Sequence, residues 1–297
     1  MNALNFFKKL INFFKKKYLS FPTLSFLISS KNELIKKLYV NFWIFVSKRN
    51  ISFKKYFFDQ KDNEINKNKI TFDLNYKIEN LEEKCLDSLK QNGILILENA
   101  LNKKEHNEII EYFNKMSIKQ GNNLRSNSSV MRYFEYFDLK KFELLKLVSD
   151  HFTKIVYGKV LNSQAEFYIH KSLKIPEDIE HGDNNLHIDR FLPNMKILYS
   201  PFEITSDGAP FSYALGSHKI NNKYIQFVKN SKKFNESEEN AKEFIKDKKE
   251  ITCKANTIII ALTSGFHGRK SFLKKTDRKL IFLQYHKSFN KISLIFG

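Results

Sequence analysis

The chain has 297 residues, of which 42% are hydrophobic and 28% are charged. This balance excludes an intrinsically disordered chain, and the length is sufficient to bury a core without cross-links. Two cysteines, Cys85 and Cys253, exclude a disulfide framework and a zinc ribbon, so we expect a cytoplasmic protein. The formal net charge is +19, and the first 60 residues carry 12 Lys/Arg against 2 Asp/Glu, or 12 − 2 = +10 of it. Charge alone, without a recognised motif, predicts no specific nucleic-acid partner.

The N-terminal segment 1–60 is predicted to be a basic helical extension. Its first apolar residues recur at the spacings of one helix face: Leu4, Phe7, Ile11, Phe14 and Tyr18. Lysines cover the rest of the surface, so residues 1–58 suit peripheral contact with an anionic membrane surface. The alternative is a basic helix docked on the main domain by its aromatic side. We expect no bilayer-spanning segment and no secretory signal.

The main domain is predicted over 61–297. A helix–strand–helix pattern covers 85–116, and a further helix is expected over 142–157. Asn102 is expected to cap the second helix of the pattern, with Glu105 at the capping-box position.

From about residue 164 the pattern changes to short β-rich runs separated by Pro, Gly and polar residues. The runs are AEFYIHKSLKI (165–175), MKILYSPFEI (195–204), APFSYAL (209–215), NTIIIAL (256–262) and KLIFLQYHK (279–287). A polar, mostly helical insertion is expected at about 221–250. Many short strands without alternating helices indicate an antiparallel sandwich or jelly roll, so the predicted fold class is mainly β with flanking helices.

His187 and Asp189 stand two positions apart in the run NNLHIDRFLP, a spacing that points both side chains to one face of a strand. Such a pair alone is most often a surface ion pair or a satisfied core histidine. Two histidines and one carboxylate, however, make up the facial triad of non-haem Fe(II) oxygenases, which leaves positions open for a cosubstrate and O₂. The candidates for the third ligand are His218, His267 and His286. His267 stands in a turn after the apolar run NTIIIAL, a good place from which to aim one imidazole at a site.

The open metal positions suit a bidentate cosubstrate. 2-Oxoglutarate would chelate iron through its 2-oxo group and C1 carboxylate, and its C5 carboxylate would need a buried cation. Arg278 lies eleven residues after His267, where a two-strand hairpin would bring it beside the metal. Its planar fork pairs bidentately with a carboxylate. Arg278 alone would be an ordinary strand-edge charge, and the accompanying triad favours the binding role.

Three blocks of sequence occur in a recognisable order: NGILILENALNKKEHNEII, HIDRFLPNMKILYSPFEITSDGAPFSYALGSHK and FHGRKSFLKKTDR. Over roughly 85–290 they resemble the phytanoyl-CoA dioxygenase-like family of Fe(II)/2-oxoglutarate oxygenases. The resemblance implies a double-stranded β-helix core with iron held by His187, Asp189 and His267. It also implies that Arg278 holds the C5 carboxylate of 2-oxoglutarate.

The activity that the resemblance implies is hydroxylation by O₂, with release of succinate and CO₂ and with ascorbate as an additive in vitro. The expected substrate is a small molecule, a lipid or a glycan precursor. Lys196 and Tyr199 lie on one predicted strand whose alternation turns them to opposite faces, and each is expected to help hold the cosubstrate or the substrate. His218 is expected to be structural. The alternative is a non-catalytic jelly-roll binding module that retains the fold, although such a module would be expected to have lost part of the ligand set.

Overall fold

The computed structural model describes residues 33–58, 70–75, 78, 81, 83–118, 124–127, 130–172, 185–231 and 239–285. The predicted amphipathic face between Leu4 and Tyr18 lies outside these residues, as does His286. Within the described ranges, no helix is long and apolar enough to cross a membrane.

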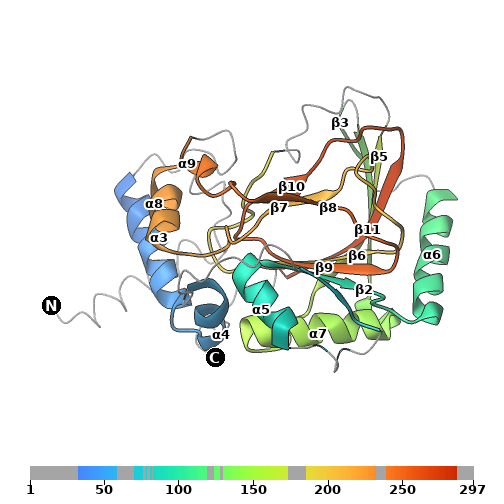
Figure 1. Ribbon diagram of the computed structural model, residues 1–297, viewed down its shortest axis with the longest axis horizontal. Helices are drawn as coiled ribbons and strands as arrows, with labels where there is room; N and C mark the ends of the chain where they lie inside the picture. Colours follow the sequence, from blue (N-terminus) through green and yellow to red (C-terminus); the bar gives the residue numbers. More distant parts are fainter. Residues whose placement is uncertain are drawn as a thin grey trace.

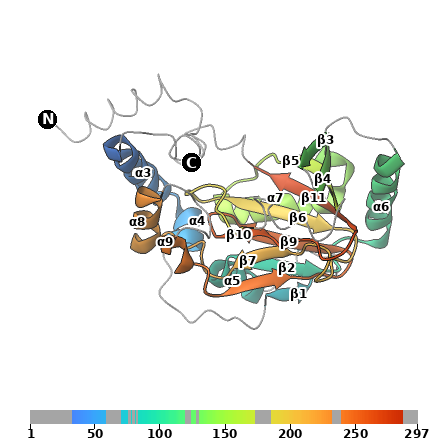
Figure 2. The same ribbon diagram turned by 90° about the horizontal axis from the view of Figure 1, so that it is seen from above.

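Helices surround a β core (Figure 1). The helical segments are α3 (Glu33–Ser47), α4 (Ile51–Phe53), the π-helical turn η1 (Lys54–Phe58), α5 (Glu83–Asn92), α6 (Lys103–Ile118), the 3-10 turn η3 (Leu139–Lys141), α7 (Glu143–Tyr157), α8 (Asn222–Asn230) and α9 (Glu239–Lys242). Figures 1 and 2 show α3 and α8 together at one end of the sheets and α6 at the other end. The two helices predicted within 85–116 correspond to α5 and α6, and the helix predicted over 142–157 corresponds to α7.

The strands form two sheets, one of order β1-β2-β9-β6-β11-β5-β4-β3 and one of order β10-β7-β8. Their bounds are β1 (Thr71–Asp73), β2 (Ile94–Glu98), β3 (Leu124–Asn127), β4 (Val130–Phe137), β5 (Gln164–Ser172), β6 (Met195–Ser200), β7 (Phe211–Ala214), β8 (Lys248–Ile251), β9 (Thr257–Leu262), β10 (His267–Arg269) and β11 (Asp277–Gln284). Every paired strand is antiparallel except β1 with β2. The smaller sheet faces the larger one (Figure 1), so the predicted mainly β jelly roll with flanking helices is confirmed.

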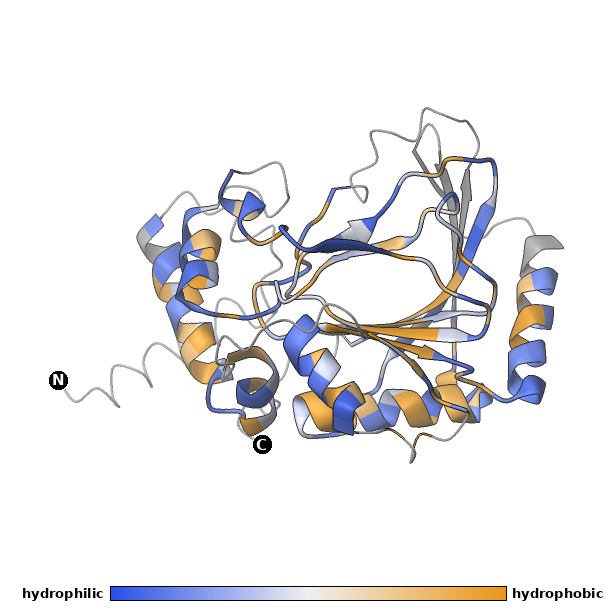
Figure 3. Cartoon of the chain, viewed as in Figure 1, coloured by the Kyte–Doolittle hydropathy of each residue, from blue (hydrophilic) through white to orange (hydrophobic). Residues whose placement is uncertain are grey.

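Alternation along the strands divides the apolar core into two parts. One set of side chains from β2, β6 and β9 packs toward the helices: Leu95, Leu97, Met195, Ile197, Tyr199, Ile258, Ile260 and Leu262. The alternate set packs with residues of the smaller sheet: Ile94, Ile96, Leu198, Ile259 and Ala261 with Phe211, Tyr213 and Ile251. Figure 3 shows the resulting hydrophobic colour along β9 and α7. Because Lys196 alternates with Met195 and Ile197, its side chain enters the space between the sheets.

Helix α7 covers the outer face of the larger sheet with residues at spacings of three and four: Leu145, Val148, Phe152 and Val156. Its first backbone N–H groups are capped from another helix, because those of Leu144 and Leu145 each donate to the Glu105 carboxylate at 2.9 Å. Asn102 accepts from the Glu105 N–H at 2.9 Å, as predicted for the cap of α6. The Glu105 carboxylate therefore caps α7 rather than completing the predicted capping box of α6.

The segment 33–58 is docked on the domain by its apolar side. Its buried residues belong to the same core cluster as the sheet and α7: Tyr39, Val40, Phe42, Trp43, Val46, Phe53 and Phe57. The buried Lys36 ammonium donates to the Ser231 carbonyl at the end of α8 (2.8 Å), and the Ile220 N–H donates to the Phe57 carbonyl (2.8 Å). Residues 33–58 are therefore docked on the main domain by their aromatic side, which is the alternative stated for the N-terminal segment.

Several strands were not expected from the sequence. β1, β3 and β10 have three or four residues, too few to show a period, and β8 begins at Lys248, inside the range expected to be a helical insertion. β4 has eight residues, and its run VMRYFEYF is rich in the aromatic residues that favour strands.

Candidate metal centre

His187 and His267 face each other across a single antiparallel bridge. The His187 N–H donates to the His267 carbonyl and the His267 N–H donates to the His187 carbonyl, both at 2.9 Å. Asp189 is fixed by its own N–H, which donates to the Thr263 carbonyl at 3.2 Å. His187 and Asp189 therefore lie in an extended segment bridged to β10 rather than on the continuous strand expected from the sequence.

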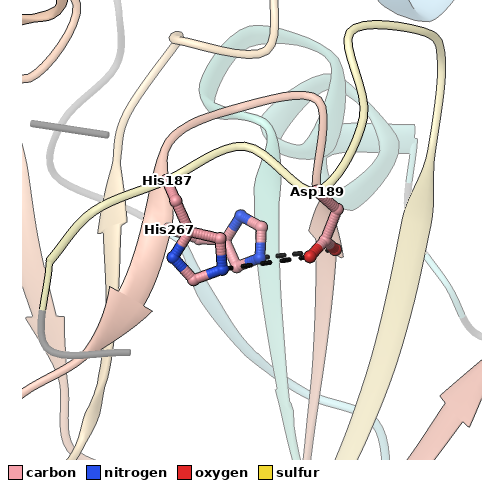
Figure 4. Close-up of side chains that lie close together, drawn as sticks. All are labelled: His187, Asp189 and His267. Carbon is pink, nitrogen blue, oxygen red and sulfur yellow. Dashed lines mark ion pairs between the residues drawn. The ribbon is translucent and has the colours of Figure 1, made fainter. Parts of the chain in front are cut away.

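The three side chains converge on one point (Figure 4). His267 Nε2 lies 3.4 Å from Asp189 Oδ2, and His187 Nε2 lies 3.9 Å from Asp189 Oδ1. One ligand atom from each residue lies within 4.8 Å of the others. Ligand atoms that share a metal ion at about 2.1 Å lie about 3 Å apart, so small side-chain movements suffice to close this set around a divalent ion. The predicted ligands are thus brought together.

Backbone carbonyls orient both imidazoles. His267 Nδ1 lies 2.9 Å from the Gly265 carbonyl, and His187 Nδ1 lies 3.1 Å from the Asn185 carbonyl. Because a carbonyl only accepts, each Nδ1 carries the proton, and each Nε2 is left with the lone pair that a metal requires. His267 Nε2 is buried and makes no hydrogen bond to the described residues. A buried acceptor of this kind fits a metal ion.

The electrostatics of the site favour the metal-binding protonation states. Burial by itself would raise the pKa of Asp189, but the Lys196 ammonium, at 2.8 Å from Oδ2 and 3.0 Å from Oδ1, and the two imidazoles outweigh it. The pKa of Asp189 therefore lies well below its usual range. Burial, with the neighbouring His267, lowers the pKa of His187. A carboxylate and a neutral imidazole are the forms that coordinate metal.

The turn that carries His267 is held by hydrogen bonds with β7, with the turn after β7, and with α8. Tyr213 Oη donates to the Leu262 carbonyl (2.8 Å), Tyr224 Oη donates to the Ser264 carbonyl (2.9 Å), and the Phe266 N–H donates to Ser217 Oγ (2.8 Å). Gly265 permits this close approach, since a Cβ there would lie 2.4 Å from Tyr213 Oη.

A cavity of ≈ 260 Å³ opens beside the three ligands. Its other lining residues are Tyr168, Lys196, Leu198, Phe211, Gly268, Arg269, Arg278, Phe282 and Gln284. Arg278 is 4% exposed and lies on β11 of the larger sheet, so the predicted carboxylate clamp shares a cavity with the metal ligands. The volume is slightly below the roughly 300–1,000 Å³ typical of ligand pockets. It suits a small cosubstrate and the reacting end of a substrate.

Two predicted binding residues are placed differently. Tyr199 is absent from the cavity lining, and its hydroxyl lies 2.6 Å from His106 Nδ1 and 3.2 Å from Asn256 Oδ1 on the helix side of the sheet. The prediction for Tyr199 is wrong because β6 turns positions 196 and 199 to opposite faces. Lys196 does line the cavity, but its ammonium is paired with Asp189 rather than directed only at a ligand.

The rival ligand His218 lies outside the cluster. It is fully buried, its Nε2 donates to the Lys90 carbonyl at 3.1 Å, and its ring packs against Phe57. Its structural role was expected from the resemblance. Arg269, by contrast, was not singled out in the sequence, although its position two residues after His267 on one strand was the available signal.

No protein-family model matches the chain, and no curated sequence matches it significantly. A crystal structure of the non-haem α-ketoglutarate-dependent epimerase SnoN from nogalamycin biosynthesis matches with a TM-score of 0.51 at 9% identity, over 68% of this chain and 81% of SnoN. The chain shares the fold of this enzyme. HygX from Streptomyces hygroscopicus, with nickel, 2-oxoglutarate and hygromycin B bound, has a TM-score of 0.42 at 13% identity, over 68% and 86%. EctD from S. alaskensis with bound iron has 0.42 at 13%, over 68% and 75%.

Proposed function

We propose that the protein is an Fe(II)- and 2-oxoglutarate-dependent dioxygenase of the phytanoyl-CoA dioxygenase-like type. The observation behind the proposal is the convergence of His187, Asp189 and His267 at a cavity that also contains Arg278. Three protein ligands leave the remaining metal positions open to small molecules. When bound there, Fe(II) and 2-oxoglutarate supply the O₂-activating chemistry, with succinate and CO₂ as products.

The protein's own groups hold and orient these molecules. The Nε2 atoms of His187 and His267 and the Asp189 carboxylate would hold Fe(II), and the Gly265 carbonyl fixes the His267 tautomer. The Arg278 guanidinium would pair with the C5 carboxylate of 2-oxoglutarate. Aromatic rings line part of the cavity, and apolar surroundings of this kind would strengthen these charge interactions.

Hydroxylation is the proposed outcome for a small-molecule, lipid or glycan-precursor substrate. The fold itself supports more than one outcome, since SnoN is an epimerase and SnoK, at a TM-score of 0.47, is a carbocyclase. Hydroxylation is supported by the sequence resemblance, and by Asp189, whose carboxylate would occupy the position that a halide needs in a halogenase.

Anaerobic titrations of Fe(II) and then 2-oxoglutarate test the proposed roles. We expect His267→Ala to abolish Fe(II) binding. Arg278→Gln should retain Fe(II) but bind 2-oxoglutarate at least about tenfold more weakly, because a charge-assisted bidentate pair is lost. Lys279→Gln is the matched control, since Lys279 lies next on β11 with its ammonium over the Phe202 ring at 5.1 Å. Equal 2-oxoglutarate affinities in the Arg278 and Lys279 variants would remove Arg278 from the clamp.

We also propose that the protein is cytoplasmic and contacts membrane surfaces through its N-terminal segment. Support comes from apolar side chains exposed beside basic residues on 33–58: Leu38, Phe45 and Ile51 with Lys37, Lys48, Arg49, Lys54 and Lys55. Because 33–58 supplies core residues, a test should delete only 1–32 and combine this with Phe45→Ser and Ile51→Ser. Full-length protein should sediment with phosphatidylserine-containing vesicles and the altered protein should not. Equal sedimentation of both would contradict the proposal.

A further inference from the structure

Arg269 is a second buried arginine in the cavity that the proposed chemistry does not use. It lies two residues after the ligand His267 on β10, so both side chains leave the same face of the smaller sheet. The spacing of two strand residues is about 7 Å. A group held by Arg269 would therefore lie near the metal, at the reacting end of a substrate.

The Arg269 guanidinium is fixed in place. The residue is 3% exposed, Nη1 donates to the Lys270 carbonyl at 3.1 Å, and the guanidinium carbon lies 5.3 Å from the centre of the Phe272 ring. A guanidinium oriented in advance loses less conformational entropy when it binds an oxyanion. Phe272 thus helps to hold the Arg269 guanidinium in place beside the cavity.

The charges that line the cavity do not balance. Among the described residues that line it, Asp189 is the one acid, whereas Lys196, Arg269 and Arg278 are cations. With both imidazoles neutral, as metal ligands are, these residues carry 3 − 1 = +2. Fe(II) and 2-oxoglutarate bring +2 and −2, which cancel. An anion that enters the cavity therefore meets more cationic than acidic side chains in its lining.

One arginine fork is sufficient for one carboxylate. Arg278, from the larger sheet, is assigned to the C5 carboxylate of 2-oxoglutarate, which leaves Arg269, from the smaller sheet and beside the metal ligand His267, for another group. We propose that the substrate is an anion and that Arg269 binds its oxyanion group, a carboxylate or a phosphate. This inference rests on the proposed function and narrows its substrate class.

The test uses full-length protein loaded with Fe(II) and 2-oxoglutarate in the absence of O₂. The probes are methylphosphonate, for a phosphate, and acetate, for a carboxylate, and the measurement is the broadening of their methyl proton resonances by paramagnetic Fe(II). Wild type should broaden at least one probe in a saturable manner, and the stronger of the two identifies the oxyanion. Arg269→Gln should weaken probe binding at least about tenfold and change 2-oxoglutarate affinity less than about threefold.

Two further variants separate the effect of the arginine fork from that of positive charge alone. Arg269→Lys retains the charge without the fork and should weaken probe binding by a smaller factor, and Lys270→Gln, next on the chain, should match wild type. The proposal is overturned if Arg269→Gln broadens the probes as wild type does, or if it loses 2-oxoglutarate as Arg278→Gln is expected to. Wild type that binds neither Fe(II) nor 2-oxoglutarate would instead contradict the proposed function, and the inference with it.

Discussion

The Lys196–Asp189 ion pair shows how single residues prepare the site. The Lys196 ammonium lies within 3.0 Å of both Asp189 oxygens, and the two side chains are each 16% exposed. Lys196 therefore keeps the carboxylate charged and fixed in the same way that outer-shell partners orient metal ligands. We regard Lys196 as a positioning residue that acts through Asp189.

Replacing Lys196 by Met should expose this role. The metal-free variant would hold a largely buried carboxylate without its cation, so we expect its free energy of unfolding to fall by about 3 kcal/mol. Added Mn(II) should stabilise the variant less than wild type, because loss of an outer-shell partner typically lowers metal affinity about 10–100-fold. Urea unfolding with and without Mn(II) measures both effects, and Lys196→Arg is the control. An equal or larger stabilisation by Mn(II) in the variant than in wild type would refute the positioning role.

Residue identity and spacing were sufficient to predict which three side chains lie together, but not every contact around them. His187, Asp189 and His267 were found because metal ligation demands particular residue types at spacings that strands can present. Arg269 was missed because the sequence FHGR was expected to be a turn, so its spacing of two from His267 was not interpreted as one face of a strand. Alternation along β6 directs Tyr199 toward the helices.

At the scale of elements, the Gly-Ser-His-Lys turn after β7 is a structural support for the metal site. Its Ser217 holds the turn before β10, while His218 fills the space beside Gly93, where φ is +77° and a Cβ would lie 2.3 Å from His218 Nδ1. Burial, together with the Lys219 charge, lowers the pKa of His218 to about 3. The turn is thus built around a neutral imidazole.

This neutral histidine should make stability depend on pH. In the unfolded chain His218 has its ordinary pKa of 6.5, whereas in the folded protein its pKa is about 3. Between these two values the unfolded state binds a proton that the folded state does not bind, so the free energy of unfolding decreases as the pH falls through this window. Near pH 5 the loss attributable to His218 should be about 1 kcal/mol per pH unit. Urea unfolding from about pH 7 to about pH 5 should therefore show a shallower pH slope for His218→Gln than for wild type. Identical slopes would contradict this account.

Elements whose own sequence has a clear apolar pattern could be predicted, whereas short strands without such a pattern could not. The apolar runs that became β6, β9 and β11 are buried on both faces by helices and by the smaller sheet, so their composition identifies them. Strands β8 and β10 are short, and tertiary pairing with β7 rather than intrinsic propensity makes them strands. The helices of 33–58 were predicted, whereas their docking depends on contacts with α7 and α8 that lie far along the chain.

For the whole molecule, two sheets and their helices bring distant segments to one cavity. The metal ligands come from the segment before β6 and from β10, the clamp candidate from β11, and the supporting turn from the end of β7. This arrangement explains why no short stretch of the sequence is sufficient to identify the function, while the ordered set of blocks points to it. The proposed function requires these three ligands to support 2-oxoglutarate-dependent chemistry.

Formation of succinate tests that claim most directly. Purified protein is incubated in air with Fe(II), ascorbate and 2-oxoglutarate, beside the double variant His187→Ala, Asp189→Ala, and succinate is measured over time. We expect succinate from wild type alone, because the variant lacks two of the three ligands that hold iron. Equal succinate from both proteins would show that this site is not responsible for the chemistry. Wild type that forms no succinate and binds neither Fe(II) nor 2-oxoglutarate would contradict the proposed function itself.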